Sequence, residues 1–155
     1  MTVGIGFDIH KLAKGRKLVL GGVKITHPKG LLGHSDGDVV LHALCDAILG
    51  ASGGGDIGEK FPDTDKKYKN IRSQKLLSQV AKYIKDKWAI ENVDINIFAE
   101  EPKLGNIKQE IRNNVAGMLH IDTTAVNVKA KSMNDCWVSA KNSIAAQAVV
   151  SLIKK

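Results

Sequence analysis

The chain has 155 residues and a formal net charge of +7, with 43% hydrophobic, 25% charged and 5% aromatic residues. This length and hydrophobic fraction predict one domain, spanning residues 1–155, with a hydrophobic core. No run of about 18 or more apolar residues occurs, which excludes a membrane-spanning helix. Two cysteines are too few for a disulfide framework.

The positive charge favours an anionic partner, and a small phosphorylated ligand accounts for it as well as nucleic acid does. The low aromatic content and the lack of an RNP-like, zinc-finger or helix-turn-helix pattern argue against nucleic acid. We therefore expect a small-molecule ligand. The N-terminus has no signal-peptide or transit-peptide pattern, so we expect a cytoplasmic protein, or one from a plastid-type organelle if such a peptide has been removed.

The first half of the chain is predicted to be rich in strands. Its expected elements are strands at 2–9, 17–20 and 23–26, a helix at 38–51 and a loop at 52–65. Gly21 and Gly22 form a hairpin-type connection between the two short strands. The loop assignment depends on its density of Gly, Pro and Asp.

In the second half, helical and strand periodicities alternate. Its expected elements are a helix at 71–87, a strand at 93–99, a helix at 107–118, a strand at 126–131 and a helix at 142–153. The expected helix 142–153 is apolar on more than one face, so it packs either against another subunit or within the core. These elements predict an α+β fold in which a mixed β-sheet is packed on one face by α-helices.

The residue types near the N-terminus are those of a metal site. The period of a strand places Asp8 and His10 on one face. On the helix that follows, Asp38, His42 and Asp46 are four residues apart and form a polar stripe, which needs partners if the helix is buried. Two imidazoles and a carboxylate are the ligands of a catalytic zinc site with an open fourth position. A hydrogen-bonded structural pair is the alternative for Asp8 and His10.

Two loops carry further candidate groups. Asp56, Asp63 and Asp65 could accept hydrogen bonds from the hydroxyls of a polyol, or could be solvated turn residues. After the strand 93–99, the chain turns at Pro102. Backbone groups there could bind a base edge and Lys103 a phosphate, or the segment could be an ordinary strand exit.

Five motifs occur in one order along the chain. They are Gly4-x-Gly6-Phe7-Asp8-x-His10, Leu31-x-x-His34-Ser35-Asp36-Gly37-Asp38-x-x-x-His42, Gly55-Asp56-Ile57-Gly58, Phe61-Pro62-Asp63-Thr64-Asp65 and Pro102-Lys103-Leu104. With these motifs the chain closely resembles the 2-C-methyl-D-erythritol 2,4-cyclodiphosphate synthase family of the non-mevalonate isoprenoid pathway. The resemblance covers nearly the whole chain.

The resemblance implies a homotrimer with active sites between subunits and one zinc ion per subunit, held by Asp8, His10 and His42. The implied enzyme is a phosphorus–oxygen lyase. In its substrate, 4-diphosphocytidyl-2-C-methyl-D-erythritol 2-phosphate, the 2-phosphate attacks the β-phosphate, which closes an eight-membered ring and releases CMP.

The same resemblance assigns substrate contacts. His34 and the hydroxyl of Ser132 would position or stabilise the reacting phosphates. The methylerythritol would be bound by Asp56, Gly58 and Asp63, with Ser35 nearby, and the turn 99–105 of a neighbouring subunit would hold the cytidyl half. The further expected contacts are Asp8, His10, Ile57, Phe61, Pro62, Thr64, Asp65, Ala99, Glu100, Pro102, Lys103, Leu104, Gly105 and Asn134.

Two segments depart from the family pattern. Members usually read Lys-Ala-x-Thr-x-Glu after the last strand, where the Glu helps to hold a second divalent ion, Mg²⁺ or Mn²⁺. This chain has Ser132 in place of the Thr and Asn134 in place of the Glu, with Asp135 one position further on. A Gly-Arg-Gly-Glu-Gly-like stretch of the family, which lines a cavity on the trimer axis, is replaced here by a shorter segment with Trp137 and Lys141.

Two other functions compete with a cyclase. A metal-dependent phosphohydrolase would admit water in place of the internal phosphate. A basic nucleotide-binding or nucleic-acid-binding module would use the metal for structure alone and would bind nucleic acid with a strong dependence on salt.

Overall fold

The computed structural model describes residues 1–33, 35–62, 64–68, 71–134, 136 and 140–155. Its elements are β1 (Thr2–Lys14), β2 (Leu18–Leu20), β3 (Val23–Ile25), β4 (Lys29–Leu31), α1 (Val39–Ser52), α2 (Ile57–Lys60), η1 (Lys66–Tyr68), α3 (Ser73–Ile84), β5 (Trp88–Phe98), α4 (Lys108–Leu119), η2 (Thr123–Ala125), β6 (Val126–Lys131), η3 (Ala140–Asn142) and β7 (Ser143–Lys154). Within these described ranges, every helix is too short or too polar to cross a membrane.

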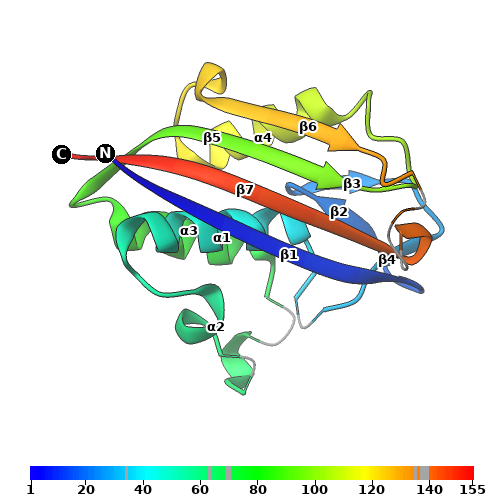
Figure 1. The fold of residues 1–155 in the computed structure, drawn as a ribbon. Helices are drawn as coiled ribbons and strands as arrows, with labels where there is room; N and C mark the ends of the chain where they lie inside the picture. Colours follow the sequence, from blue (N-terminus) through cyan, green and yellow to red (C-terminus); the bar gives the residue numbers. More distant parts are fainter. Residues whose placement is uncertain (34, 63, 69–70, 135, 137–139) are drawn as a thin grey trace.

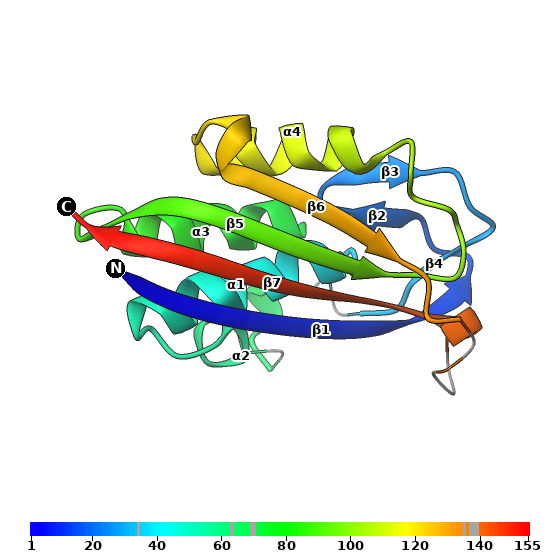
Figure 2. The same cartoon turned by 45° about the horizontal axis from the view of Figure 1, so that its top comes forward.

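A five-stranded sheet in the order β4-β1-β7-β5-β6 forms one layer, and α1, α3 and α4 lie against one of its faces (Figures 1 and 2). The strands β5 and β6 pair in parallel, whereas β1 pairs antiparallel with β4 and β7, and β7 with β5. The strands β2 and β3 form a separate hairpin. The structure therefore confirms the prediction of a mixed sheet with helices on one face.

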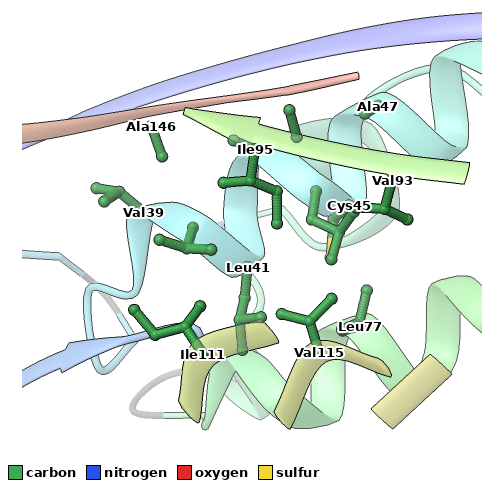
Figure 3. Packing of buried hydrophobic residues seen from close by; sticks show 14 of the residues in the cluster. Val39, Leu41, Cys45, Ala47, Leu77, Val93, Ile95, Ile111, Val115 and Ala146 are labelled. Carbon is green, nitrogen blue, oxygen red and sulfur yellow. The ribbon is translucent and has the colours of Figure 1, made fainter. Parts of the chain in front are cut away.

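Helix α1 lies between the sheet and the other long helices. It begins after Asp38, whose side chain accepts hydrogen bonds from two backbone N–H groups of its first turn, and it ends at Gly53 in the left-handed conformation. Figure 3 shows side chains of α1 between Ile95 and Ala146 of the sheet and Ile111 and Val115 of α4. Because α1 is covered on several sides, ten of its fourteen residues are buried.

The prediction of a helix over 142–153 is wrong, because residues Ser143–Lys154 form the central strand β7. The strand lies between β1 and β5, and its side chains are buried along most of its length. Residues 143–146 are buried on both faces, and further along the outward-facing residues Val149 and Ile153 are apolar although exposed, so the alternation that identifies a half-exposed strand is weak. Ala-rich sequence favours a helix, but tertiary packing decides here.

The other predicted elements are confirmed with changes at their ends. The first strand continues to Lys14, and the strand expected from residue 93 begins at Trp88. Four short elements within expected connections were not predicted, namely β4, the four-residue helix α2 and the 3-10 helices η1 and η2. Elements of three or four residues are too short to show a period.

Glycines on β1 let α1 approach the sheet closely. Gly4 and Gly6 face the helix, and a Cβ atom at either position would lie within 3.0 Å of a backbone carbonyl oxygen of α1. On β7, Ala148 lies opposite Gly6, and Ala146 lies opposite Asp8. Small residues on two adjacent strands therefore form the floor on which α1 packs.

The opposite face of β1 and β7 is apolar and exposed. Alternate residues of β1 lie on this face, and its members are Val3, Ile5, Phe7 and Ile9 from β1 and Val149 and Ile153 from β7. Ile5 is 63% exposed and lies opposite Val149 in the sheet. We call these six residues the open sheet face. Ser151 and Gln147 lie on the same face, opposite Val3 and Phe7. Large exposed groups of apolar side chains are typical of interaction surfaces.

Replacing Gly6 with alanine tests the close approach of α1. The added methyl group must displace the backbone of the helix, so we expect a loss of about 1–3 kcal/mol in the free energy of unfolding. Gly117→Ala in α4 is the matched control, because nothing lies within 4 Å of its Cβ position; this change is expected to stabilise by about 0.5–1 kcal/mol. Urea unfolding measures both, and equal stability of the two variants would contradict the packing argument.

Candidate metal and substrate site

Three side chains converge where β1 passes α1. Asp8 and His10 lie two residues apart on the helix-facing side of β1, as the period of the strand predicts, and His42 comes from the first turns of α1. Asp8 Oδ2 lies 3.0 Å from His10 Nε2 and 3.0 Å from His42 Nδ1. The ring centroids of the two histidines are 5.4 Å apart. The predicted ligand set is therefore brought together.

Each imidazole has a second partner that faces away from Asp8. His10 Nδ1 lies against the carbonyl oxygen of Leu32, to which its N–H donates. His42 Nε2 lies against the hydroxyls of Ser35 and Ser73. These partners leave Nε2 of His10 and Nδ1 of His42 directed at Asp8. Histidines that bind a metal are held in this way by an acceptor on the other ring nitrogen.

The ionisation of the cluster follows from its contacts. Burial raises the pKa of Asp8, but hydrogen bonds and charge interactions with His10 and His42 outweigh it, and the pKa is lowered to about 2. The hydrogen bond to Asp8 raises the pKa of His10 above its ordinary value of 6.5. In the absence of a metal, Asp8 is therefore ionised and holds a proton on a neighbouring imidazole.

The donor set fits a divalent metal. The candidate ligand atoms of Asp8, His10 and His42 lie within 4.8 Å of one another, and they form the one such group within the part of the chain that the structure describes. One carboxylate and two imidazoles match the composition of open zinc sites. The same donors also bind other first-row metals, so the geometry supports a metal site of this type.

The rest of the predicted polar stripe on α1 has other partners. Asp38 is fully buried, and its carboxylate accepts hydrogen bonds from the N–H groups of Gly21 and Gly22 and from the first turn of α1. Burial raises the pKa of Asp38 to about 6, against the opposing effect of these donors. Asp46 accepts a hydrogen bond from the N–H of Ile57 and so attaches the loop that follows α1.

A cavity of about 500 Å³ opens beside His10 and His42. The predicted contacts Ser35, Ile57, Gly58, Phe61 and Pro62 line it. Its remaining lining residues are Gly33, Tyr68, Ile71 and Leu76, none of which was predicted. The cavity is thus polar at the metal ligands and apolar along the opposite wall.

Other predicted residues of this region do not line the cavity. Asp56 caps the short helix α2 by accepting a hydrogen bond from Glu59 N–H. Thr64 is exposed, and Asp65 forms an ion pair with Lys67. The predicted residues His34 and Asp63 lie outside the described residues, as do Asp135 and Trp137.

The remaining predicted contacts lie at the ends of β5 and β6. Ala99 N–H donates to the carbonyl of Lys131, and Glu100 accepts a hydrogen bond from Met133 N–H. These contacts join the two strand ends. None of the other predicted residues here lines the cavity described above, namely Pro102, Lys103, Leu104, Gly105, Ser132 and Asn134.

The described residues at the end of β6 provide no carboxylate for a second divalent ion, and Asp135 lies outside the described residues. Asn134 has a positive φ of 48°, and its Oδ1 accepts a hydrogen bond from the hydroxyl of Ser132 at 2.8 Å. No carboxylate occurs among residues 131–134, and the nearby carboxylate of Glu100 is already bonded to Met133 N–H. Hard divalent cations prefer carboxylate oxygens, which the described residues 131–134 do not offer.

Comparison with known proteins gives consistent matches. A model described as the YgbB family matches residues 1–153. The 2-C-methyl-D-erythritol 2,4-cyclodiphosphate synthase of Alkaliphilus oremlandii (strain OhILAs) is 49% identical over 156 residues, which cover 99% of each chain. A CDP-bound structure of a protein with that enzyme name has a TM-score of 0.90 at 33% identity and covers 97% of this chain and 99% of that one. The IspF–CDP complex of Plasmodium falciparum has a TM-score of 0.85 at 38% identity and covers 99% and 96%.

The charges of the cluster predict a pH-dependent stability of the metal-free protein. The lowered pKa of Asp8 stabilises the fold above about pH 4, and this contribution is lost as the pH falls toward 2. The raised pKa of His10 stabilises it below about pH 6.5, and this contribution is lost as the pH rises through the raised value. Asp8→Asn should therefore lower the free energy of unfolding most between these limits, by about 1–2 kcal/mol.

Urea unfolding across this pH range, with chelator present, measures the difference. The exposed residue Asp86 supplies the control, because Asp86→Asn removes a carboxylate away from the cluster. A difference between Asp8→Asn and the unaltered protein that stays constant with pH would contradict the assigned ionisation.

Proposed function

The chain belongs to the YgbB family of 2-C-methyl-D-erythritol 2,4-cyclodiphosphate synthases, which act in the isoprenoid pathway. We propose that it converts 4-diphosphocytidyl-2-C-methyl-D-erythritol 2-phosphate into 2-C-methyl-D-erythritol 2,4-cyclodiphosphate and CMP. The observation that carries this proposal is the cluster of Asp8, His10 and His42, whose two histidines line a cavity of about 500 Å³. The CDP complexes of two similar proteins support a cytidyl nucleotide as the ligand class.

The proposed reaction is an internal phosphoryl transfer. An oxygen of the 2-phosphate forms a bond to the β-phosphorus of the diphosphate. The bond from that phosphorus to the bridging oxygen breaks, and its electron pair leaves with CMP. The nucleophile is already an anion, so no side chain has to remove a proton. The protein has to fold the substrate with the attacking and leaving oxygens in line and to compensate for the negative charge.

The described residues have different roles in this reaction, which follow from their positions. A zinc ion held by Asp8, His10 and His42 would supply Lewis acidity and a template for the diphosphate. The cavity wall formed by Ile57, Gly58 and Phe61 encloses the methylerythritol and excludes water from the β-phosphorus. Water would compete with the internal phosphate for the β-phosphorus. Its exclusion therefore favours ring closure over hydrolysis.

The second half of the site is assigned to a neighbouring copy of the chain. The predicted cytidyl contacts in segment 99–105 and the predicted phosphate contact Ser132 do not line the cavity of their own chain. A homotrimer packed through the open sheet face would supply them from another subunit. The support for this assembly is the exposure of six apolar side chains on one face of β1 and β7.

Loss of the metal ligand on α1 should abolish the reaction. His42→Ala is expected to lower CMP release at least 100-fold, and a strong chelator should do the same to the unaltered protein. His120→Asn is the control, because His120 is exposed and occupies the left-handed cap of α4, a conformation that Asn tolerates. The assay follows CMP and the phosphate products from the cytidyl substrate with magnesium present.

Product analysis separates the cyclase from the competing functions. Formation of a linear phosphate without ring closure would contradict the cyclase and favour a phosphohydrolase. Full CMP release by zinc-free protein would contradict the role given to Asp8, His10 and His42. Salt-sensitive binding to nucleic acid without any CMP release would favour the binding module.

A charge on the open sheet face should separate the subunits. Ile5→Asp places a carboxylate among apolar side chains that are buried in the proposed trimer, so we expect a monomer with at least 100-fold lower activity. Light scattering after size-exclusion chromatography measures the mass. Tyr83→Asp is the control, because Tyr83 is an exposed apolar residue of α3. A monomeric unaltered protein with full activity would contradict the proposed assembly.

A further inference from the structure

The imidazole of His42 is held from behind by residues of two other segments. Its Nε2 lies 2.9 Å from Ser73 Oγ and 3.0 Å from Ser35 Oγ, on the side of the ring that faces away from Asp8. Ser73 is fully buried and is the first residue of α3. This contact therefore joins the proposed metal site to a helix that supplies no ligand to it.

Ser73 is in turn fixed by a carboxylate. Its backbone N–H lies 3.3 Å from both oxygens of Asp36, and its hydroxyl donates to Asp36 Oδ1. An ionised carboxylate only accepts hydrogen bonds, so the single proton of the Ser73 hydroxyl points at Asp36. The oxygen of Ser73 then has only lone pairs to offer to His42.

Ser35 is constrained in a similar way. Its oxygen accepts a hydrogen bond from Gly37 N–H at 3.1 Å and lies 3.3 Å from Ser73 Oγ. Its backbone carbonyl accepts a hydrogen bond from the guanidinium of Arg16 at 2.7 Å. When the Ser35 hydroxyl donates to Ser73, both hydroxyl oxygens can only accept from His42. The proton in these hydrogen bonds therefore has to be carried by His42 Nε2.

We infer that Asp36 and Ser73 are positioning residues that hold His42 in the tautomer with a proton on Nε2, so that the lone pair of Nδ1 faces the metal. The inference depends on the metal site proposed above, and it deepens that proposal. His10 reaches the equivalent state through a backbone carbonyl, which no substitution removes. We call the hydrogen-bonded chain from Asp36 through Ser73 to His42 the relay. It consists of side chains, so substitutions can remove it.

Loss of a residue of this relay should weaken metal binding even in the absence of substrate. Partners of a metal-ligating histidine typically contribute 10–100-fold to affinity. Ser73→Ala removes the acceptor, and Asp36→Asn removes the charge with little change of shape. We expect zinc binding weakened 10–100-fold by Ser73→Ala and to a smaller extent by Asp36→Asn, measured by competition with a chromogenic chelator. The absorption spectrum of bound Co²⁺ should change as well, because it reports the orientation of the ligands.

Ser78→Ala on the exposed side of α3 is the matched control. Urea unfolding of the metal-free variants adds a readout of their fold. Weaker zinc binding and a changed Co²⁺ spectrum, with unfolding like that of the control, would support the inference. Zinc affinity within twofold of the control, or an unchanged Co²⁺ spectrum with lowered stability, would overturn it. Absence of zinc binding by the unaltered protein would overturn the metal site and the relay together.

Discussion

The contact between the backbone of β1 and the backbone of α1 is the constraint on which the site depends. Helices usually pack on sheets through intervening side chains, but Gly4 and Gly6 present none to α1. The helix therefore lies close enough for an imidazole from its second turn to reach a carboxylate on the strand. A larger residue at either glycine would lift the helix and separate His42 from Asp8. The metal ligands and the closest packing of the fold are thus parts of one arrangement.

Asp8 unites the cluster because both imidazoles contact the same carboxylate oxygen. Each ring is also held from its far side, one by a backbone carbonyl and one by two hydroxyls. Both rings therefore keep their orientation whether a proton or a metal ion lies between them. A site prepared in this way needs little rearrangement when it binds a cation, which is the physical meaning of preorganisation in metal sites.

The sequence predicts the metal ligands well because their signal is local. The period of two on β1 and the spacing of four on α1 place Asp8, His10 and His42 on facing surfaces before any tertiary contact is known. The roles of Asp38 and Asp46 could not be read in the same way, because their partners are backbone N–H groups of Gly22 and Ile57, which no residue type marks. The contact between Ser73 and Asp36 was not predicted, because no local pattern links two residues 37 positions apart. The prediction of a helix over 142–153 was wrong because apolar residues on both faces of β7, including the exposed Val149 and Ile153, weaken the alternation of a strand.

The pairing of β1 with β7 has a consequence for the order of events during synthesis. Thr2 lies opposite Leu152, so the strand that carries two metal ligands is completed by a segment that is synthesised after every other strand of the sheet (Figure 1). Until then β1 has no partner along one edge, and its apolar residues face solvent or a chaperone. The contacts involved span almost the whole chain, which is typical of slow-folding topologies. A protein interrupted before β7 would contain every metal ligand and still lack the scaffold that brings them together.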